Sequence, residues 1–131
     1  MYNIEYLTIK DKLEQNGYRR VDIKELEEGI VDMFVNRKGQ VISLRIFDGG
    51  YRTKQVKISK TENGYLKYNI YTHNKQCKTR MLAQDVYNTF RSTDFKNQDI
   101  YYIDNNKENC TLDKLVSITS LLTIYRKVKN S

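Results

Sequence analysis

The stretch QVISLRIF, residues 40–47, alternates between two sets of side chains. Ile42 and Leu44 fall on one side of an extended chain, whereas Ser43 and Arg45 fall on the other. A period of two is typical of a strand with one buried face, because successive side chains of a strand point to opposite faces. The stretch therefore predicts a β-strand and directs the search for its partners to the neighbouring sequence.

The segments on either side repeat this pattern. Residues 65–72, YLKYNIYT, alternate in the same way, and residues 76–82 carry Lys78 and Arg80 on one face. Turn-forming residues separate the runs, at 37–39, 48–50, 62–64 and 73–75. We expect a three- or four-stranded antiparallel meander over residues 31–82, with one apolar face and one basic face.

Helical patterns flank the expected meander. One helix is predicted from Ile4 to Gly17, and a second over 22–28, with Asp22 as its N-cap and Gly29 as its end. Further along, we expect a helix near 83–90, a short strand or turn at 100–104 and a C-terminal helix from about 117. The expected fold class is α+β, with an acidic helical segment at 1–30 and one compact unit at 31–131.

Composition restricts the chemistry. With 131 residues the chain is too short for a two-domain enzyme. A single histidine, His73, excludes sites that need two, and two cysteines cannot form a four-ligand zinc site. No apolar run reaches membrane-spanning length, and acids occupy the place of a signal peptide's apolar stretch. We expect no membrane association, a cytoplasmic location and free thiols at Cys77 and Cys110.

Charge is distributed unevenly along the chain. The formal net charge is +7. Residues 1–30 hold 5 basic and 7 acidic side chains, whereas residues 31–131 hold 18 basic and 9 acidic. A basic excess confined to one region is the pattern that a polyanion-binding surface leaves in a sequence.

Four segments in order carry a family pattern. They are MFVNRKGQVISL (33–44), NGYLKYNIY (63–71), LAQDVYNTF (82–90) and YYIDNNKENCTLDKLVSIT (101–119). Together they resemble the HNH homing endonucleases of the intron and phage type. The positions that match are Val35, Gly39, Val41, Ser43, Val86, Phe90, Asp104, Asn106, Asn109, Leu115 and Thr119. The resemblance implies a ββα-metal (His-Me finger-like) core, DNA as partner and an origin in a phage or other mobile element.

The catalytic positions of that family pattern are changed here. Tyr101 and Tyr102 stand where the family has its metal-binding Asp and its general-base His. The other aligned catalytic positions hold Lys114, Thr123 and Ala83. A tyrosine with a pKa near 10 is a poor base at neutral pH and a weak Mg²⁺ ligand when protonated. We therefore expect a degenerate core with no catalytic residue, no bound metal and no cofactor.

The basic residues of the expected meander are the predicted DNA contacts. Arg45, Lys67, Lys78 and Arg80 are expected to share the face opposite the apolar one. Arg52, Lys54, Lys57 and Lys60 lie on a connecting segment poor in acids. The predicted double-stranded DNA-binding residues are Arg45, Arg52, Lys54, Lys57, Lys67, Asn69, Lys78 and Arg80.

Two alternatives stay open. The degenerate scaffold could serve as a protein-binding effector, an anti-defence inhibitor or an anti-repressor, that docks through its acidic N-terminal helices and exposed tyrosines. It could also be a weak nuclease with a relocated metal site built from Asp99, Asp104 and Glu108. The simpler interpretation gives Asp104 the job of capping its local turn. We further expect His73 to be an exposed turn residue and Cys77 to fill a core or half-buried position.

Overall fold

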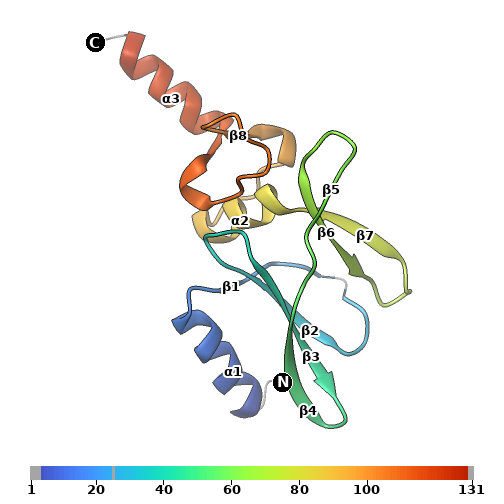
Figure 1. Ribbon diagram of the computed structural model, residues 1–131. Coiled ribbons are helices and arrows are strands. Elements are labelled where there is room, and N and C mark those ends of the chain that lie inside the picture. Colours follow the sequence, from blue (N-terminus) through green and yellow to red (C-terminus); the bar gives the residue numbers. More distant parts are fainter. Residues whose placement is uncertain (1–3, 25, 130–131) are drawn as a thin grey trace.

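The computed structural model describes residues 4–24 and 26–129, apart from the side chain of Phe47. Residues 1–3 and 25 of the predicted N-terminal segment, and residues 130–131, lie outside the described part. Within it the fold is mixed α+β, with three α-helices and antiparallel sheets (Figure 1). The α+β class expected from the sequence is therefore confirmed.

The first sheet is four-stranded, in the order β1-β2-β3-β4. Its strands are β1 (Arg19–Arg20), β2 (Ile30–Val35), β3 (Val41–Phe47) and β4 (Gly50–Gln55). We expected residues 50–55 to be a connecting segment, and this was wrong. Asp48 and Gly49 both have positive φ angles, 47° and 81°. This two-residue turn matches the twist of a hairpin and returns the chain along β3 as an edge strand.

A second, three-stranded sheet follows, in the order β5-β6-β7. It contains β5 (Ser59–Lys60), β6 (Leu66–Tyr71) and β7 (Cys77–Met81). The strands over 31–82 thus form two sheets rather than the single meander that we predicted. The break falls at 56–58, where the half-buried Val56 and Ile58 pack against the main core instead of continuing the edge strand.

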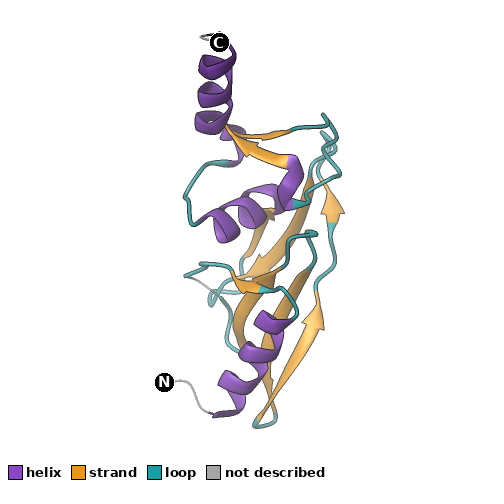
Figure 2. Ribbon diagram, turned by 90° about the vertical axis from the view of Figure 1, so that its left-hand side faces the viewer, coloured by secondary structure: helices purple, strands orange, loops and turns teal. Residues whose placement is uncertain are grey.

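The C-terminal third follows the predicted order. Helix α2 (Leu82–Arg91) precedes the short strands β8 (Ile100–Tyr102) and β9 (Leu115–Ser117), which pair antiparallel, and α3 (Ile118–Lys129) ends the described chain. The helix near 83–90, the strand at 100–104 and the C-terminal helix are confirmed. Helix α3 has no buried residue and stands clear of the body, at the end opposite α1 (Ile4–Gln15) (Figure 2).

The helix predicted over 22–28 does not form in the described residues of that segment. Two backbone N–H groups there bond to other strands or turns: that of Val21 to Met33 and that of Glu27 to the carbonyl of Tyr71 in β6. The segment connects β1 to β2 and passes beside β6 of the second sheet, and these long-range bonds replace the local ones that a helix needs. Its apolar side chains, Ile23 and Leu26, pack on the main core.

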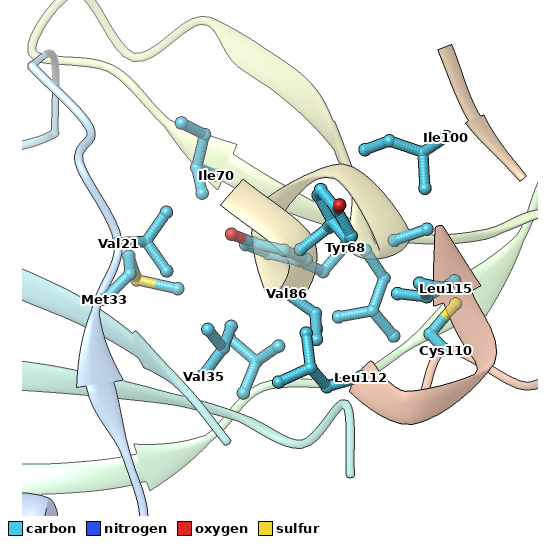
Figure 3. Packing of buried hydrophobic residues seen from close by; sticks show 14 of the residues in the cluster. Val21, Met33, Val35, Tyr68, Ile70, Val86, Ile100, Cys110, Leu112 and Leu115 are labelled. Carbon is cyan, nitrogen blue, oxygen red and sulfur yellow. The ribbon is translucent and has the colours of Figure 1, made fainter. Parts of the chain in front are cut away.

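Two apolar clusters cover the two faces of the first sheet. Directly paired residues of antiparallel strands share a face, so Val35 and Val41 lie on one face and Phe34 and Ile42 on the other. The Val35 face packs against α2, β6 and the 100–115 region and forms the main core (Figure 3). The Phe34 face packs against Tyr6 and Leu13 of α1.

Each of two helices is joined to the sheets by a buried aspartate that binds a tyrosine and an arginine. In the first network the Tyr6 hydroxyl donates to the Asp32 carboxylate, and Arg20 Nε lies 3.8 Å from Asp32 Oδ1. This network ties α1 to β2 and β1.

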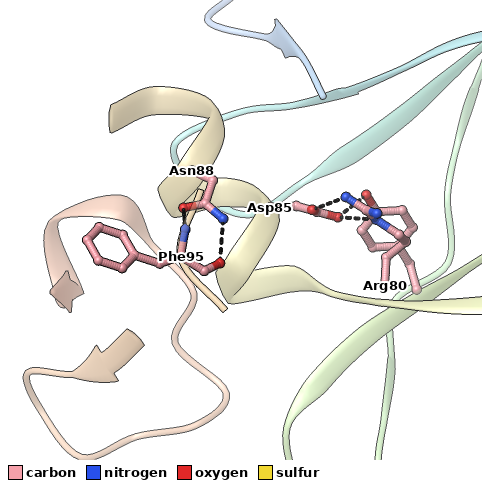
Figure 4. A network of polar contacts seen from close by, with 5 residues as sticks. Arg80, Asp85, Asn88 and Phe95 are labelled. Atoms are coloured by element: carbon pink, nitrogen blue, oxygen red, sulfur yellow. Dashed lines mark hydrogen bonds and ion pairs between the residues drawn. The ribbon is translucent and has the colours of Figure 1, made fainter. Parts of the chain in front are cut away.

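In the second network Asp85, in the first turn of α2, accepts from Tyr68 Oη at 2.5 Å and from Arg80 Nη2 at 2.6 Å and Nε at 3.1 Å (Figure 4). Asp85 is 4% exposed. Its acidic side chain also suits the positive end of the helix dipole.

Removal of Arg80 is expected to destabilise the fold strongly. In Arg80→Ala the carboxylate of Asp85 stays buried without its cation, which costs about 3 kcal/mol. The exposed Arg126 of α3 serves as the matched control, and Arg126→Ala is expected to change stability by less than about 0.5 kcal/mol. Urea unfolding of both variants measures the difference, and equal midpoints for the two would contradict the structural role of Arg80.

Candidate nucleic-acid interface

The predicted basic face is divided in the structure. In the β6–β7 hairpin, Arg80 pairs with Tyr68 and Lys78 with Ile70, so both cations lie on the face that carries the buried residues. Lys67 lies on the other face, with Asn69. The prediction that Arg45, Lys67, Lys78 and Arg80 share a face opposite the apolar residues was therefore wrong.

The turn between β6 and β7 sets this register. The N–H of Thr72 bonds to the Gln76 carbonyl, and Lys75 takes a positive φ of 60°. This loop length puts Arg80 opposite Tyr68 rather than opposite Lys67 or Asn69. A shift of one residue in register moves every side chain of a strand to the other face.

Four of the eight predicted residues meet around one cavity. A hollow of about 380 Å³ is lined by Arg45 of β3, Lys54 of β4, Lys57 of the segment before β5 and Asn69 of β6. Gln55, Val56 and Ser59 also line it. No acidic residue lines it. We call this hollow the basic groove. It lies where the first sheet meets the second, so it joins residues that are up to 24 positions apart in the sequence.

Local hydrogen bonds fix Arg45 in the groove. Its Nε donates to Ser43 Oγ at 3.0 Å, and Ser43 Oγ in turn lies 3.3 Å from the carbonyl oxygen of Lys54. Arg52 is directly paired with Arg45 across the β3–β4 ladder, so the two side chains share a face. Arg52 is exposed, and its cation extends the charged surface beyond the groove.

A larger hollow was not anticipated from the sequence. It measures about 820 Å³ and lies between residues 20–24, β7 and α2. Lys78 and Arg80 line it, but so do the acids Asp22, Asp85 and Asp94. Its mixed charge makes it less suited to a polyanion than the basic groove. Part of its lining comes from residues 22–24, which belong to the segment for which we predicted a helix.

The region that resembles the HNH core shows local roles for its polar residues. Asp104 Oδ1 accepts from the N–H of Asn106 at 3.1 Å, and Asp104 Oδ2 accepts from Asn109 Nδ2 at 3.0 Å. Asn105 has a positive φ of 57°. The capping role expected of Asp104 is confirmed. Among the described residues, no group of three His, Cys, Asp or Glu side chains could hold a metal ion.

The two tyrosines at the changed catalytic positions differ in environment. Tyr101 is 42% exposed, whereas Tyr102 is half-buried and packs on the main core. Burial, and next the neighbouring Cys110, raise the pKa of the Tyr102 phenol well above its ordinary value. The Tyr102 hydroxyl therefore stays protonated at every physiological pH.

The remaining candidate residues have simple positions. His73 is exposed in the β6–β7 turn, as expected. Both cysteines are free thiols, which confirms that prediction. Cys77 is exposed rather than a core filler, because it pairs with the exposed Tyr71 on the outer face of the second sheet. Cys110 is buried beside Leu82 and Gly39.

Comparisons with known proteins add no relative. No family model matches the chain, and neither a curated protein nor a solved structure matches it. Among the described residues, none of the helices is both long and apolar enough to pass through a bilayer. The arrangement of side chains described above is therefore the basis for a functional assignment.

The stability of the protein is expected to fall above pH 9 because of Cys110. Burial raises the pKa of this thiol from 9.0 to about 11. The unfolded chain therefore loses the proton first, and between pH 8 and pH 10 the free energy of unfolding should fall by about 1.4 kcal/mol.

Urea unfolding at pH 8 and pH 10 in a reducing buffer measures this loss. Cys110→Ala should remove the part of the loss that this thiol causes, whereas the exposed Cys77→Ala should retain the full loss. A loss of equal size in both variants would exclude Cys110 as its source.

Proposed function

We propose that this protein binds double-stranded DNA through the basic groove and does not cleave it. The observation that carries the proposal is the convergence of Arg45, Lys54 and Lys57, from separate elements, on one hollow whose lining includes no acid. Phosphate groups supply most of the affinity of proteins for DNA, and they bind arginine and lysine side chains held in fixed positions.

Further features support the same partner. Arg52 lies beside Arg45, and Asn69 adds an amide that can both donate and accept hydrogen bonds. A groove that combines fixed cations with one amide can bind phosphates along the backbone and reach a base edge. The regional excess of 18 basic over 9 acidic side chains in residues 31–131 would draw a polyanion to this part of the chain.

The environment of Tyr102 supports the proposal of binding without cleavage. Activation of water for attack on phosphorus needs a base that is unprotonated near pH 7. A phenol whose pKa is raised by burial cannot supply one, and it is a weak ligand for Mg²⁺ while it is protonated. The order β8, β9, α3 agrees with a degenerate ββα core, and an accessory or regulatory role on DNA fits such a scaffold.

Loss of charge from the basic groove is expected to weaken binding to all duplexes alike. In the double variant Lys54→Ala, Lys57→Ala, the plot of log K against log salt should become shallower by about two units, since each phosphate contact contributes about one. The control Lys12→Ala, Lys127→Ala removes the same charge from α1 and α3, at exposed positions far from the groove.

Fluorescence anisotropy with a random duplex at two salt concentrations measures both variants. Equal slopes for the groove variant and its control would show that the loss of net charge, and not the loss of groove contacts, weakens DNA binding. Binding by the wild type that is undetectable or insensitive to salt would end the DNA hypothesis.

We expect no nicking of supercoiled plasmid in the presence of Mg²⁺ or Mn²⁺, because tyrosines stand at positions 101 and 102 where the family that the chain resembles has its Asp and His. Agarose gels of long incubations provide the measurement. Clear turnover that is lost in Asp104→Ala would revive the relocated metal site.

A protein partner remains the second candidate, and exposed apolar side chains favour it. Ile4 and Leu7 of α1 are 84% and 52% exposed. Deletion of residues 1–30 cannot test this function, since β1 and the buried Tyr6 are part of the fold. Pull-down from lysate with nuclease treatment, comparing wild type with Leu7→Ser, separates the candidates: a protein retained after nuclease and lost in the variant supports the second one.

A further inference from the structure

A second cationic hollow shares no lining residue with the basic groove. It measures about 520 Å³, and its lining residues come from the end of α1, from β1, from the turn between β2 and β3 and from α2. Its lining consists of Lys10, Glu14, Gly17, Tyr18, Arg19, Arg20, Arg37 and Phe90. We call it the arginine pocket.

The cations of the arginine pocket differ in whether a carboxylate lies near them. Lys10 lies 3.8 Å from Glu14, the one acid in the lining, and Arg20 lies 3.8 Å from the buried Asp32. Arg19 and Arg37 have no carboxylate at ion-pair distance among the residues that the structure describes. Both side chains are exposed, so the pocket presents positive charge that no described carboxylate pairs with.

One aromatic ring holds both arginines. The guanidinium carbon of Arg19 lies 5.1 Å from the centre of the Phe90 ring, and that of Arg37 lies 5.5 Å from it. Contact with the ring occupies the planar surface of a guanidinium and leaves its N–H edge available. The edge presents two parallel donors, which match two oxygens of a phosphate or carboxylate.

The backbone at Arg19 and at Arg37, the two residues that contact the Phe90 ring, is fixed as well. Arg19 is paired with Val35 in the β1–β2 ladder. The turn that carries Arg37 is closed by Asn36, whose Oδ1 accepts from the N–H groups of Lys38 and Gln40, and the Arg37 carbonyl accepts from the N–H of Leu112 at 2.8 Å. Two donors that are held in advance lose little entropy when a ligand binds.

We propose that the arginine pocket is a binding site for a phosphoryl group. Arg19 and Arg37 would each supply a bidentate edge, and Lys10 and Arg20 would add charge from the rim. Several converging cations favour a dianionic phosphate over a singly charged carboxylate. The site goes beyond the proposed DNA-binding groove, and its phosphate could come from a duplex backbone or from a free phosphomonoester.

Nuclear magnetic resonance titration of the full chain with inorganic phosphate, at constant ionic strength set by chloride, tests the site without a variant. We expect shifts of the amide signals of Arg19, Arg37 and Phe90 that saturate, with no comparable shift at Arg126 of α3. Shifts that are absent, or that centre on the basic groove, would overturn the proposal.

Variants then test the two arginines. Arg19→Gln and Arg37→Gln should each weaken phosphate binding about tenfold, since each removes a charge-assisted pair of hydrogen bonds. Arg126→Gln, at an exposed position of α3, should leave phosphate affinity unchanged. Equal losses in all three variants would show a general charge effect and refute the pocket.

Duplex titration of the same variants distinguishes the two sources of phosphate. Weaker duplex binding by Arg19→Gln and Arg37→Gln would assign the pocket to a DNA backbone phosphate. Unchanged duplex binding, with phosphate affinity lost, would assign it to a free phosphomonoester. Failure of the basic groove to bind DNA would leave the phosphate titration interpretable, because that titration contains no DNA.

Discussion

A buried aspartate bonded to a tyrosine and an arginine is the interaction on which the arrangement of the elements depends. Asp85 binds Tyr68 and Arg80 and so fixes α2 to the second sheet, while α2 also packs on the first. Burial and next the charge of Asp85 raise the pKa of the Tyr68 phenol well above its ordinary value, so this donor keeps its proton. Because a lone buried carboxylate is costly, the three groups hold one geometry, and that geometry determines how the two sheets meet.

Where the two sheets meet determines which cations come together. Arg45 and Lys54 belong to the first sheet and Asn69 to the second, and they surround one hollow only because α2 and residues 56–58 hold the sheets in contact. Arg80, by contrast, is bound to Asp85 in the buried network. The bonds that a basic residue of this chain makes therefore influence how far its charge is available to a ligand.

The sequence predicted those features that local pattern determines. The alternation around Leu44 and Tyr68, the turn residues and the apolar spacing of α2 identified real elements. The strand β4 escaped because, as an exposed edge strand, it has no apolar alternation to recognise. The false helix over 22–28 has its cause in backbone bonds to distant strands, whereas the wrong face of Arg80 has its cause in the β6–β7 turn that sets the register; the spacing of residues within either segment encodes neither. The meeting of Arg19 with Arg37 also depends on a long-range contact, to Phe90.

Helix α3 has a different thermodynamic status from the rest of the chain. It contributes no buried side chain, and Leu121, Leu122, Ile124 and Tyr125 are between 38% and 62% exposed. A twelve-residue helix without tertiary packing is marginal in water. Its unfolding leaves both apolar clusters intact, so it opens as a separate cooperative unit at a far lower free energy than the body. How much of α3 is helical therefore depends on the conditions around the protein rather than on packing within the fold.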